Sequence, residues 1–389
     1  MPVPNFVPLS KIAKQNRTQE RSHQEFRRSI AGQKATLPNF YSLFPDWTPH
    51  LHPEYERARD EFLNPWIKRW VSDPSTARKF QNAEFGVFGA VMCARASFEK
   101  LCTVSKAFAW YFIWDDLFDC GLLAGDTRAA HAYREIFMQY FRAALCDKGV
   151  VPDMSDHPEQ LYNALHCWDE VAAHMRQDCS RETLELLLKM KLFYISNVDT
   201  VDTVFHANRI PSLTQYWKRR EHTAGVYPVI ATIPFIYDQQ VGWDNINSHL
   251  MRLLWRHTSY LVHMINDLFS LRKEIVWPPQ FSLVIPTNKY PQTEGQIENM
   301  VPVLMLNKGI DCNQAMKLSF QLVQGVTRNF LDVESGLQTV AGDIKPATSD
   351  IFVEGCRNVV MGLTHWSYSG QRYFKHSEAN ANHEIDFHL

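Results

Sequence analysis

Apolar residues recur at three- and four-residue spacing from Leu51 onward, and sustained alternation of apolar and polar residues is nearly absent. Spacing of this kind is typical of helices with one buried face. The predicted helices cover residues 55–70, 82–118, 127–146, 158–178, 181–206, 213–224, 245–275, 293–308, 313–337 and 349–374. Residues suited to capping a helix N-terminus precede four of these runs, namely Asp126 or Thr127, Ser180, Ser212 and Asp311. The pattern therefore predicts an all-α protein.

The predicted domain organisation is simple, because no internal repeat, low-complexity tract or composition shift marks a linker. Residues 1–35 are polar and basic, and we expect a flexible arm that is extended or partly helical. Residues 36–375 are predicted to form one helical domain, and residues 376–389 a C-terminal tail. Four prolines at positions 278, 279, 286 and 291 predict a loop before the helix that begins near residue 293.

Composition narrows the choice of function class. The 389 residues carry a formal net charge of −2, which gives no electrostatic reason to expect nucleic acid or an anionic membrane as a partner. No apolar stretch approaches the roughly 20 residues that cross a bilayer, and the N-terminus lacks the pattern of a secretory signal. The eight cysteines form no CxxC pair and are expected to be reduced. We therefore expect a cytoplasmic protein, either a monomer or a homodimer.

An acidic cluster closes the predicted helix 82–118. Asp115 and Asp119 are four residues apart and share one helix face, whereas Asp116 points about 100° away. Acidic clusters at helix ends are often only solvated. Here the aromatic run 108–114 precedes the cluster, which predicts carboxylates at the mouth of an apolar region. Buried carboxylates need a metal ion or another cation as a partner.

A second oxygen-bearing stripe lies on the predicted helix 245–275. Asn266, Ser270 and Glu274 follow one another at four-residue steps and so share a face. The alternative interpretation is the polar face of an amphipathic helix, but Ser and Asn are poor residues for a helix interior. Hard divalent cations such as Mg²⁺ prefer oxygen ligands and commonly share them with phosphates. Two such stripes across a cavity would hold a diphosphate through metal ions.

The pair of motifs resembles that of the class I terpene synthases, especially the single-domain microbial type. The resemblance implies an all-α helical bundle around a central active-site cavity. It also implies three Mg²⁺ ions, with Mn²⁺ as a substitute, and a prenyl diphosphate substrate. The metal ligands it implies are Asp115, Asp119, Asn266, Ser270 and Glu274. Asp116 is expected to contribute to catalysis mainly from outside the metal's own ligand set.

Further elements extend the resemblance over residues 40–375. Lys273 matches a lysine that contacts diphosphate in some fungal members, and Arg372-Tyr373 matches the family's terminal Arg-Tyr pair. Arg220 opens a segment similar to RxxTxG, which carries the diphosphate-sensing arginine, although Arg219 is a second candidate. Arginine suits this role because its planar fork matches phosphate oxygens.

Three residues are assigned roles at the reacting centre by the resemblance alone. Gly225, with Pro228, predicts a helix break, and the resemblance implies that this break points a backbone carbonyl at the ionising substrate. A simple helix boundary would have the same sequence pattern. Phe112 and Trp366 match pocket-lining positions, where aromatic faces stabilise carbocations. Most of the other aromatic residues are expected to be core packing.

The sequence therefore predicts a terpene cyclase that ionises a prenyl diphosphate and releases diphosphate. Farnesyl diphosphate is favoured over geranylgeranyl diphosphate on the family's base rate, which leaves a diterpene synthase as the alternative. A trans-prenyltransferase would carry a second DDxxD motif where this chain has Asn266 to Ser270. A non-catalytic isoprenoid-binding protein is a further alternative, and the complete ligand sets argue against it.

Overall fold

The computed structural model describes residues 23–119, 121–204, 210–275, 297–339 and 345–389. Its first half contains α2 (His23–Ile30), η1 (Phe40–Leu43), α3 (Tyr55–Arg57), the π-helix η2 (Ala58–Leu63), α4 (Asn64–Trp70), α5 (Pro74–Asn82), α6 (Gly86–Met92), α7 (Phe98–Asp119), α8 (Thr127–Cys146), α9 (Glu159–His166) and α10 (Asp169–Asp178). The second half contains α11 (Arg181–Val204), α12 (Leu213–Thr223), α13 (Val226–Ile230), α14 (Ile233–Ile236), α15 (Trp243–Ile246), α16 (His249–Ile275), α17 (Met300–Lys308), α18 (Cys312–Thr339), α19 (Pro346–Ser369) and η3 (His376–Glu378).

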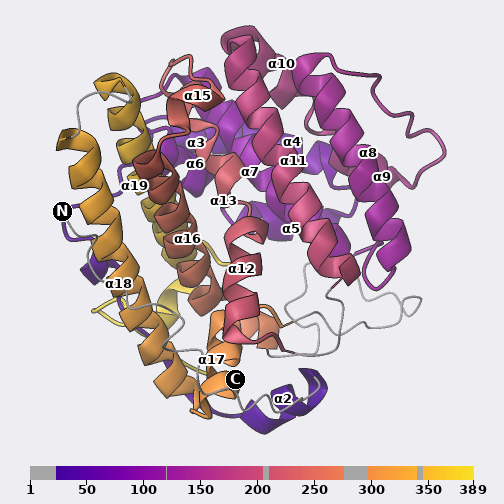
Figure 1. Cartoon of the computed structure of the whole chain (residues 1–389). Helices are drawn as coiled ribbons and strands as arrows, with labels where there is room; N and C mark the ends of the chain where they lie inside the picture. Colours follow the sequence, from indigo (N-terminus) through magenta and orange to yellow (C-terminus); the bar gives the residue numbers. More distant parts are fainter. Residues whose placement is uncertain (1–22, 120, 205–209, 276–296, 340–344) are drawn as a thin grey trace.

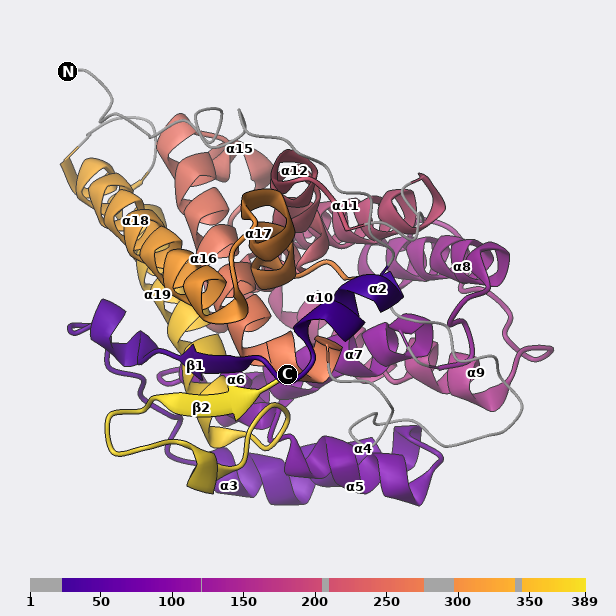
Figure 2. The same cartoon turned by 90° about the horizontal axis from the view of Figure 1, so that it is seen from below.

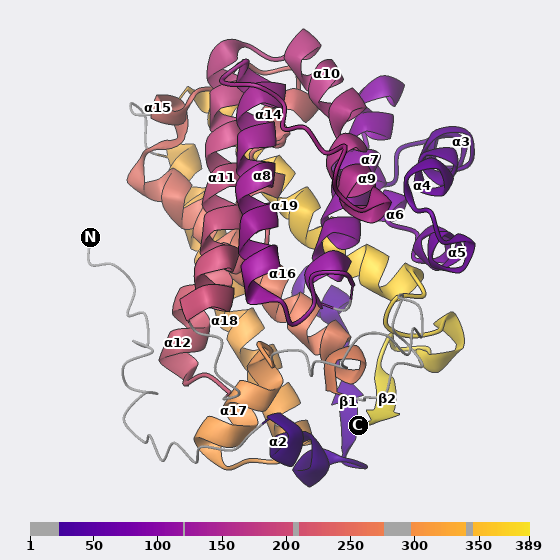
Figure 3. The same ribbon diagram turned by 90° about the vertical axis from the view of Figure 1, so that its right-hand side faces the viewer.

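Two groups of long helices surround the middle of the molecule. On one side α8 packs against α11 and α10, and on the other α16 packs against both α18 and α19 (Figure 1). The short helix α13 lies between the groups and contacts α11, α16 and α19. Figure 3 shows α8 and α11 running side by side over most of their length. This arrangement places the acidic end of α7 and the polar stripe of α16 around a common interior.

The predicted helices are confirmed in type, and several are split. The run 82–118 is interrupted between α6 and α7, 158–178 between α9 and α10, and 245–275 between α15 and α16. The last predicted helix, 349–374, ends at Ser369, so Arg372 lies beyond it. The short α5, α13 and α14 were not predicted. The helix caps at Asp126 and Ser212 are confirmed, because their side chains accept hydrogen bonds from the backbone N–H of Ala129 and Gln215.

The two ends of the described chain pair with each other. Strand β1 (Lys34–Leu37) runs antiparallel to β2 (Ile385–His388), as Figure 2 shows. In α2 the side chains of Phe26 and Ile30 are each only 2% exposed. The described part of the expected arm is therefore partly helical with buried apolar side chains, and its flexibility stays a prediction. Residues 1–22 lie outside the described residues.

Two composition-based expectations can be compared with the structure. No helix within the described ranges is long and apolar enough to cross a membrane. Seven cysteines lie in those ranges, all with free thiols, and five of them are buried. These five, Cys93, Cys102, Cys167, Cys312 and Cys356, belong to the core.

Candidate active site

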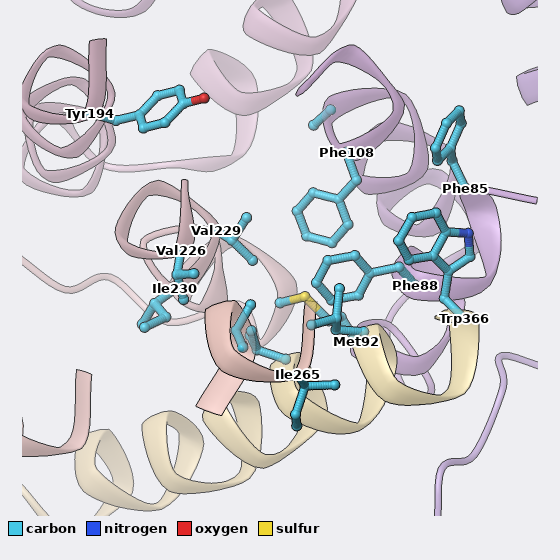
Figure 4. Close-up of a cluster of buried hydrophobic side chains, with 14 of the residues drawn as sticks. Phe85, Phe88, Met92, Phe108, Tyr194, Val226, Val229, Ile230, Ile265 and Trp366 are labelled. Atoms are coloured by element: carbon cyan, nitrogen blue, oxygen red, sulfur yellow. The ribbon is translucent and has the colours of Figure 1, made fainter. Parts of the chain in front are cut away.

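A cavity of about 150 Å³ lies between α6, α7, α11, α12, α13, α16 and α19. Most of its wall is apolar, and Figure 4 shows Phe88 and Phe108 on one side, with Val226 and Val229 on the other. The polar side chains of this wall include Asp115, Arg220 and Asn266. They come from α7, α12 and α16, so the fold brings three separately predicted site elements to one cavity.

The acidic end of α7 contains a carboxyl group with a raised pKa. Burial raises the pKa of Asp115, as does the neighbouring carboxylate of Asp116, whereas the positive charges of Arg372, Lys273 and Arg220 oppose the rise. Asp116 is 5% exposed, and its Oδ1 lies 3.6 Å from Nη2 of Arg372. Asp115 lines the cavity, and Asp116 is not among its described lining residues. The side chain of Asp119 lies outside what the structure describes.

The three residues of the predicted row on α16 all form side-chain hydrogen bonds. Asn266 Nδ2 donates to the Tyr373 hydroxyl at 2.9 Å, and Asn266 Oδ1 accepts from Arg220 Nη2 at 3.3 Å. Ser270 Oγ donates to Glu274 Oε1. Each side chain of the predicted row is therefore hydrogen-bonded, Ser270 to Glu274 within the row and Asn266 to Tyr373 of the C-terminal Arg-Tyr pair.

Asp267 connects α16 to the segment of α12 that carries the candidate sensor arginines, a position that the sequence analysis missed. It is fully buried and accepts from the Tyr216 hydroxyl at 2.5 Å, from Arg220 Nη2 at 2.9 Å and from the Met300 N–H at 2.7 Å. Burial raises the pKa of Asp267 to about 6, against the lowering effect of Arg220. An aspartate followed by the apolar Leu268 and Phe269, on a different face from the predicted ligands, was the available signal.

The two candidate sensor arginines occupy different positions. Arg220 lines the cavity and is bonded to Asp267 and Asn266. Arg219 forms an ion pair with Glu298 and is not among the described residues that line the cavity. The geometry therefore favours Arg220 as the arginine that reaches a ligand in the cavity.

The predicted helix break lies at Gly225. Helix α12 ends at Thr223, and Gly225 has φ +71° as the residue before α13. Glu221 ties the two sides of the break together, because it accepts from Tyr227 at 2.7 Å and from Tyr260 of α16 at 2.9 Å. Gly225 lines the cavity, so backbone without a side chain faces the interior there.

The two predicted pocket aromatics differ in position. Phe112 lines the cavity, and the guanidinium carbon of Arg372 lies 4.8 Å from its ring centroid. Trp366 is fully buried, donates from Nε1 to the Ala83 carbonyl at 2.6 Å, and packs 5.0 Å from the Phe112 ring. The structure thus places Trp366 behind Phe112 rather than at the described cavity wall, which differs from the expectation for this residue.

The side chains present fit a metal-bound diphosphate. In the described ranges, no three His, Cys, Asp or Glu side chains come together as a metal site. Two of the predicted ligands, Asn266 and Ser270, are of other residue types, and the side chain of Asp119 lies outside the described structure. All five predicted metal ligands offer side-chain oxygen atoms, which are the ligands that Mg²⁺ prefers. In addition, Nε and Nη1 of Arg372 are buried and have no hydrogen-bond partner among the described residues. Buried guanidinium N–H groups without partners are suited to an anionic ligand.

Asn299 is a further site residue that the sequence did not reveal. Its Nδ2 donates to Glu274 Oε2 at 3.1 Å and to the Asp267 carbonyl at 2.6 Å. Its Oδ1 accepts from the Val301 N–H and so begins α17. Nothing in its sequence context distinguishes this asparagine from an ordinary helix cap.

The helical fold, the cavity and its two oxygen-bearing helices define a class I terpene synthase. The family model described as "Terpene synthase family 2, C-terminal metal binding" matches residues 106–328, which is more than half of the chain. The chain therefore belongs to this family and is a terpene synthase of the microbial type, a lyase.

Known proteins agree with this assignment. The chain is 23% identical to terpene cyclase braA of Annulohypoxylon truncatum, over 91% of this chain and 90% of that protein. It is also 23% identical to sesquiterpene cyclase hepA of Aspergillus oryzae, over 87% and 88% of the two chains. Germacradien-4-ol synthase from Streptomyces citricolor has a similar fold, with a TM-score of 0.65, 14% identity, and 85% and 99% of the two chains covered.

Proposed function

We propose that this terpene synthase ionises farnesyl diphosphate with Mg²⁺ and cyclises the resulting cation to a sesquiterpene, releasing diphosphate. The observation that carries the proposal is the single cavity onto which Asp115, Arg220 and Asn266 all open, and whose remaining wall is mainly apolar. Such a cavity has one end suited to a metal-bound diphosphate and another suited to a hydrocarbon chain. The C15 substrate is supported by the sesquiterpene cyclase named among the relatives.

The metal ions would be held by the two helices that carry oxygen ligands. On α7 the ligands are Asp115 and Asp119, and on α16 they are Asn266, Ser270 and Glu274. Bound Mg²⁺ supplies charge that stabilises the departing diphosphate. We propose three ions, with Mn²⁺ as a substitute.

The chain's own cations act on the same leaving group. Two nitrogens of Arg372, Nε and Nη1, have no hydrogen-bond partner among the described residues, and Arg220 stands at the cavity with its fork held by Asp267. Lys273 lies close enough to Asp115 for its charge to affect the pKa of that carboxyl. Donors fixed in advance stabilise developing charge with little reorganisation. The apolar wall excludes water, and the Phe112 ring offers a face to the cation.

The experiment that tests the proposal is incubation of the purified protein with C10, C15 and C20 prenyl diphosphates and Mg²⁺. We expect diphosphate release and cyclic C15 products by gas chromatography–mass spectrometry, and no release after removal of the metal with EDTA. Cyclic C20 products instead would identify a diterpene synthase. Chain elongation with isopentenyl diphosphate would identify a trans-prenyltransferase, and no turnover of any substrate would indicate a non-catalytic binding protein.

A further inference from the structure

A lysine lies in the aromatic core of the protein, away from the predicted ligand sets. Lys191, on α11, is 1% exposed. Its Nζ lies 4.0 Å from the ring centroid of Tyr111, 4.3 Å from that of Trp110 and 4.8 Å from that of Trp168. The Phe141 ring closes the group at 5.3 Å. Four rings thus surround one amino group, and we call this group the Lys191 cage.

The cage holds the lysine without a carboxylate. Within the described part of the chain, Lys191 forms no ion pair. Burial keeps the pKa of its amino group well below the ordinary value. Burying an amino group is costly, and a methionine would fill similar space without that cost. Among the described residues, the amino group of Lys191 makes one hydrogen bond, and this bond is where the lysine can affect the site.

That hydrogen bond reaches the wall of the cavity. Lys191 Nζ donates to the Tyr111 hydroxyl at 2.6 Å, and Tyr111 lines the cavity on α7. A carbon of the Tyr111 ring, Cδ1, lies 3.8 Å from the position that a side chain at Gly225 would begin to occupy. Lys191 itself is not among the described residues that line the cavity. The bond therefore holds the hydroxyl toward the core while the ring remains at the wall.

We propose that Lys191 is a positioning residue that controls the product of the reaction by holding the Tyr111 hydroxyl out of the cavity. The inference deepens the proposed function and rests on it, since it assumes that a carbocation forms in this cavity. With the bond in place, Tyr111 presents a ring to the cation, and a ring stabilises cations without reacting.

A hydroxyl released into the cavity would end the reaction early. Its oxygen would accept a proton from a carbon next to the cationic centre. The electron pair of that C–H bond would become a C=C bond, and the oxygen would pass the extra proton to the released diphosphate. The product would be an acyclic or early-quenched alkene in place of the cyclic one.

The experiment compares Lys191→Met, Tyr111→Phe and the double variant with the wild type. All four proteins are assayed for diphosphate release and for product ratio on the same samples. We expect Lys191→Met to retain diphosphate release and to raise the fraction of early-quenched products by about fivefold, the effect of losing one ordinary hydrogen bond. Tyr111→Phe should change the ratio less, although Tyr111 lines the cavity and Lys191 does not.

The double variant separates positioning from packing. Because Phe at position 111 has no hydroxyl to release, adding Tyr111→Phe should return the Lys191→Met product ratio to that of Tyr111→Phe alone. Two packing defects would instead add. A double variant as altered as Lys191→Met, or more so, would overturn the proposal. If Lys191→Met does not fold, a shift in Tyr111→Phe beyond about threefold overturns it, and a smaller one supports it.

Lys100 provides a matched control. It is a second buried lysine, 4% exposed, which is paired with Asp238 and does not line the described cavity. Lys100→Met should lower the melting temperature without changing the product ratio. An equal shift in product ratio would also overturn the proposal, because any buried lysine would then have the same effect. Absence of diphosphate release in the wild type would refute the proposed function instead.

Discussion

The two predicted ligand helices hold similar oxygen chemistry in different ways. On α16 the ligands are already bonded, with Asn266 to Tyr373 and Ser270 to Glu274. On α7 the carboxylate of Asp115 is buried beside that of Asp116, and two nitrogens of the nearby Arg372 have no hydrogen-bond partner within the described ranges. The predicted ligands of α16 are thus held by hydrogen bonds, whereas two neighbouring carboxylates of α7 lie near the charge of Arg372.

This difference suggests a division of labour between the helices. A hydrogen-bonded row of ligands is preorganised and loses little freedom when a metal binds. Buried like charges repel one another, and a bound cation relieves that repulsion. We therefore expect α16 to set the geometry of the metal site and α7 to provide more of the driving force for binding. The following predictions test this contrast, from the largest expected effect to the smallest.

The largest expected effect is at Asp115, which lines the cavity. Asp115→Asn removes a charge from the proposed metal site and should lower kcat by about 1000-fold at saturating Mg²⁺. Asp116→Asn should be less damaging, because Asp116 faces Arg372 and does not line the described cavity. The measurement is steady-state diphosphate release. A larger loss in Asp116→Asn would exchange the roles of the two carboxylates.

On α16 the prediction concerns additivity. Asn266→Ala and Ser270→Ala should each lower kcat by about 100-fold, and the double variant should be little worse than the more damaging single change. The reason is that ligands acting on one ion are lost as a unit. The measurement is a double-mutant cycle of the rates of diphosphate release. If the two losses multiply, the residues act independently and do not bind one ion together.

Replacing either arginine of the candidate site by lysine should lower the activity. Arg372→Lys and Arg220→Lys keep the charge but lose the planar fork, so each should lower kcat by about tenfold or more. Arg219→Lys is the matched control, because Arg219 pairs with Glu298 and does not line the described cavity. Single-turnover rates should separate the three. Full activity of Arg220→Lys with loss in Arg219→Lys would make Arg219 the sensor.

A substitution at Asn299 tests whether a residue of the α17 N-terminus helps to hold the predicted metal ligand Glu274 in place. Asn299→Ala removes the hydrogen bond to Glu274 and should raise the Mg²⁺ concentration for half-maximal rate by about tenfold. Asn307→Ala, on the same helix α17, loses bonds to the Pro211 and Val303 carbonyls instead. It should leave the Mg²⁺ requirement unchanged. Equal shifts in both variants would indicate a general effect of destabilising α17.

The last prediction concerns the free energy of unfolding in acid, through His257 on α16. Burial lowers the pKa of His257 to about 4, from about 6.5 in the unfolded chain. Below pH 6.5 the unfolded state therefore binds a proton that the folded state does not. The free energy of unfolding should fall by up to about 1.4 kcal/mol per pH unit until pH 4.

Denaturant unfolding of the wild type and His257→Gln at pH 7 and pH 5 measures the contribution of His257. The variant should lose less stability than the wild type between these two values. Equal losses would show that other groups account for the acid sensitivity.

The fold could be predicted wherever local pattern determines it. The helix predicted at 127–146 is α8, and the Ser212 cap begins α12 as expected. Breaks at Cys167 and at 93–97 were missed because apolar spacing continues across them. The pairing of β1 with β2 joins residues some 350 positions apart, and no local signal records such contacts.

The candidate site could be predicted in its residue types but not in its connections. Helical spacing placed Asn266, Ser270 and Glu274 on one face, and the structure bonds Ser270 to Glu274 and Asn266 to Tyr373. The central place of Asp267 and the support from Asn299 depend on α12 and α17 meeting α16. Trp366 is the opposite case, since its position in the sequence suggested the cavity and packing placed it behind Phe112.

By itself the sequence determined the helices and the kinds of chemistry, because a helix repeats every 3.6 residues and spacing alone fixes which side chains share a face. Tertiary structure alone decided which faces meet. It brought Asp115, Arg220 and Asn266 to one cavity, and it enclosed Lys191 among four rings. The physical reason is that packing depends on shape and burial summed over the whole chain, and these are not recorded in any one segment.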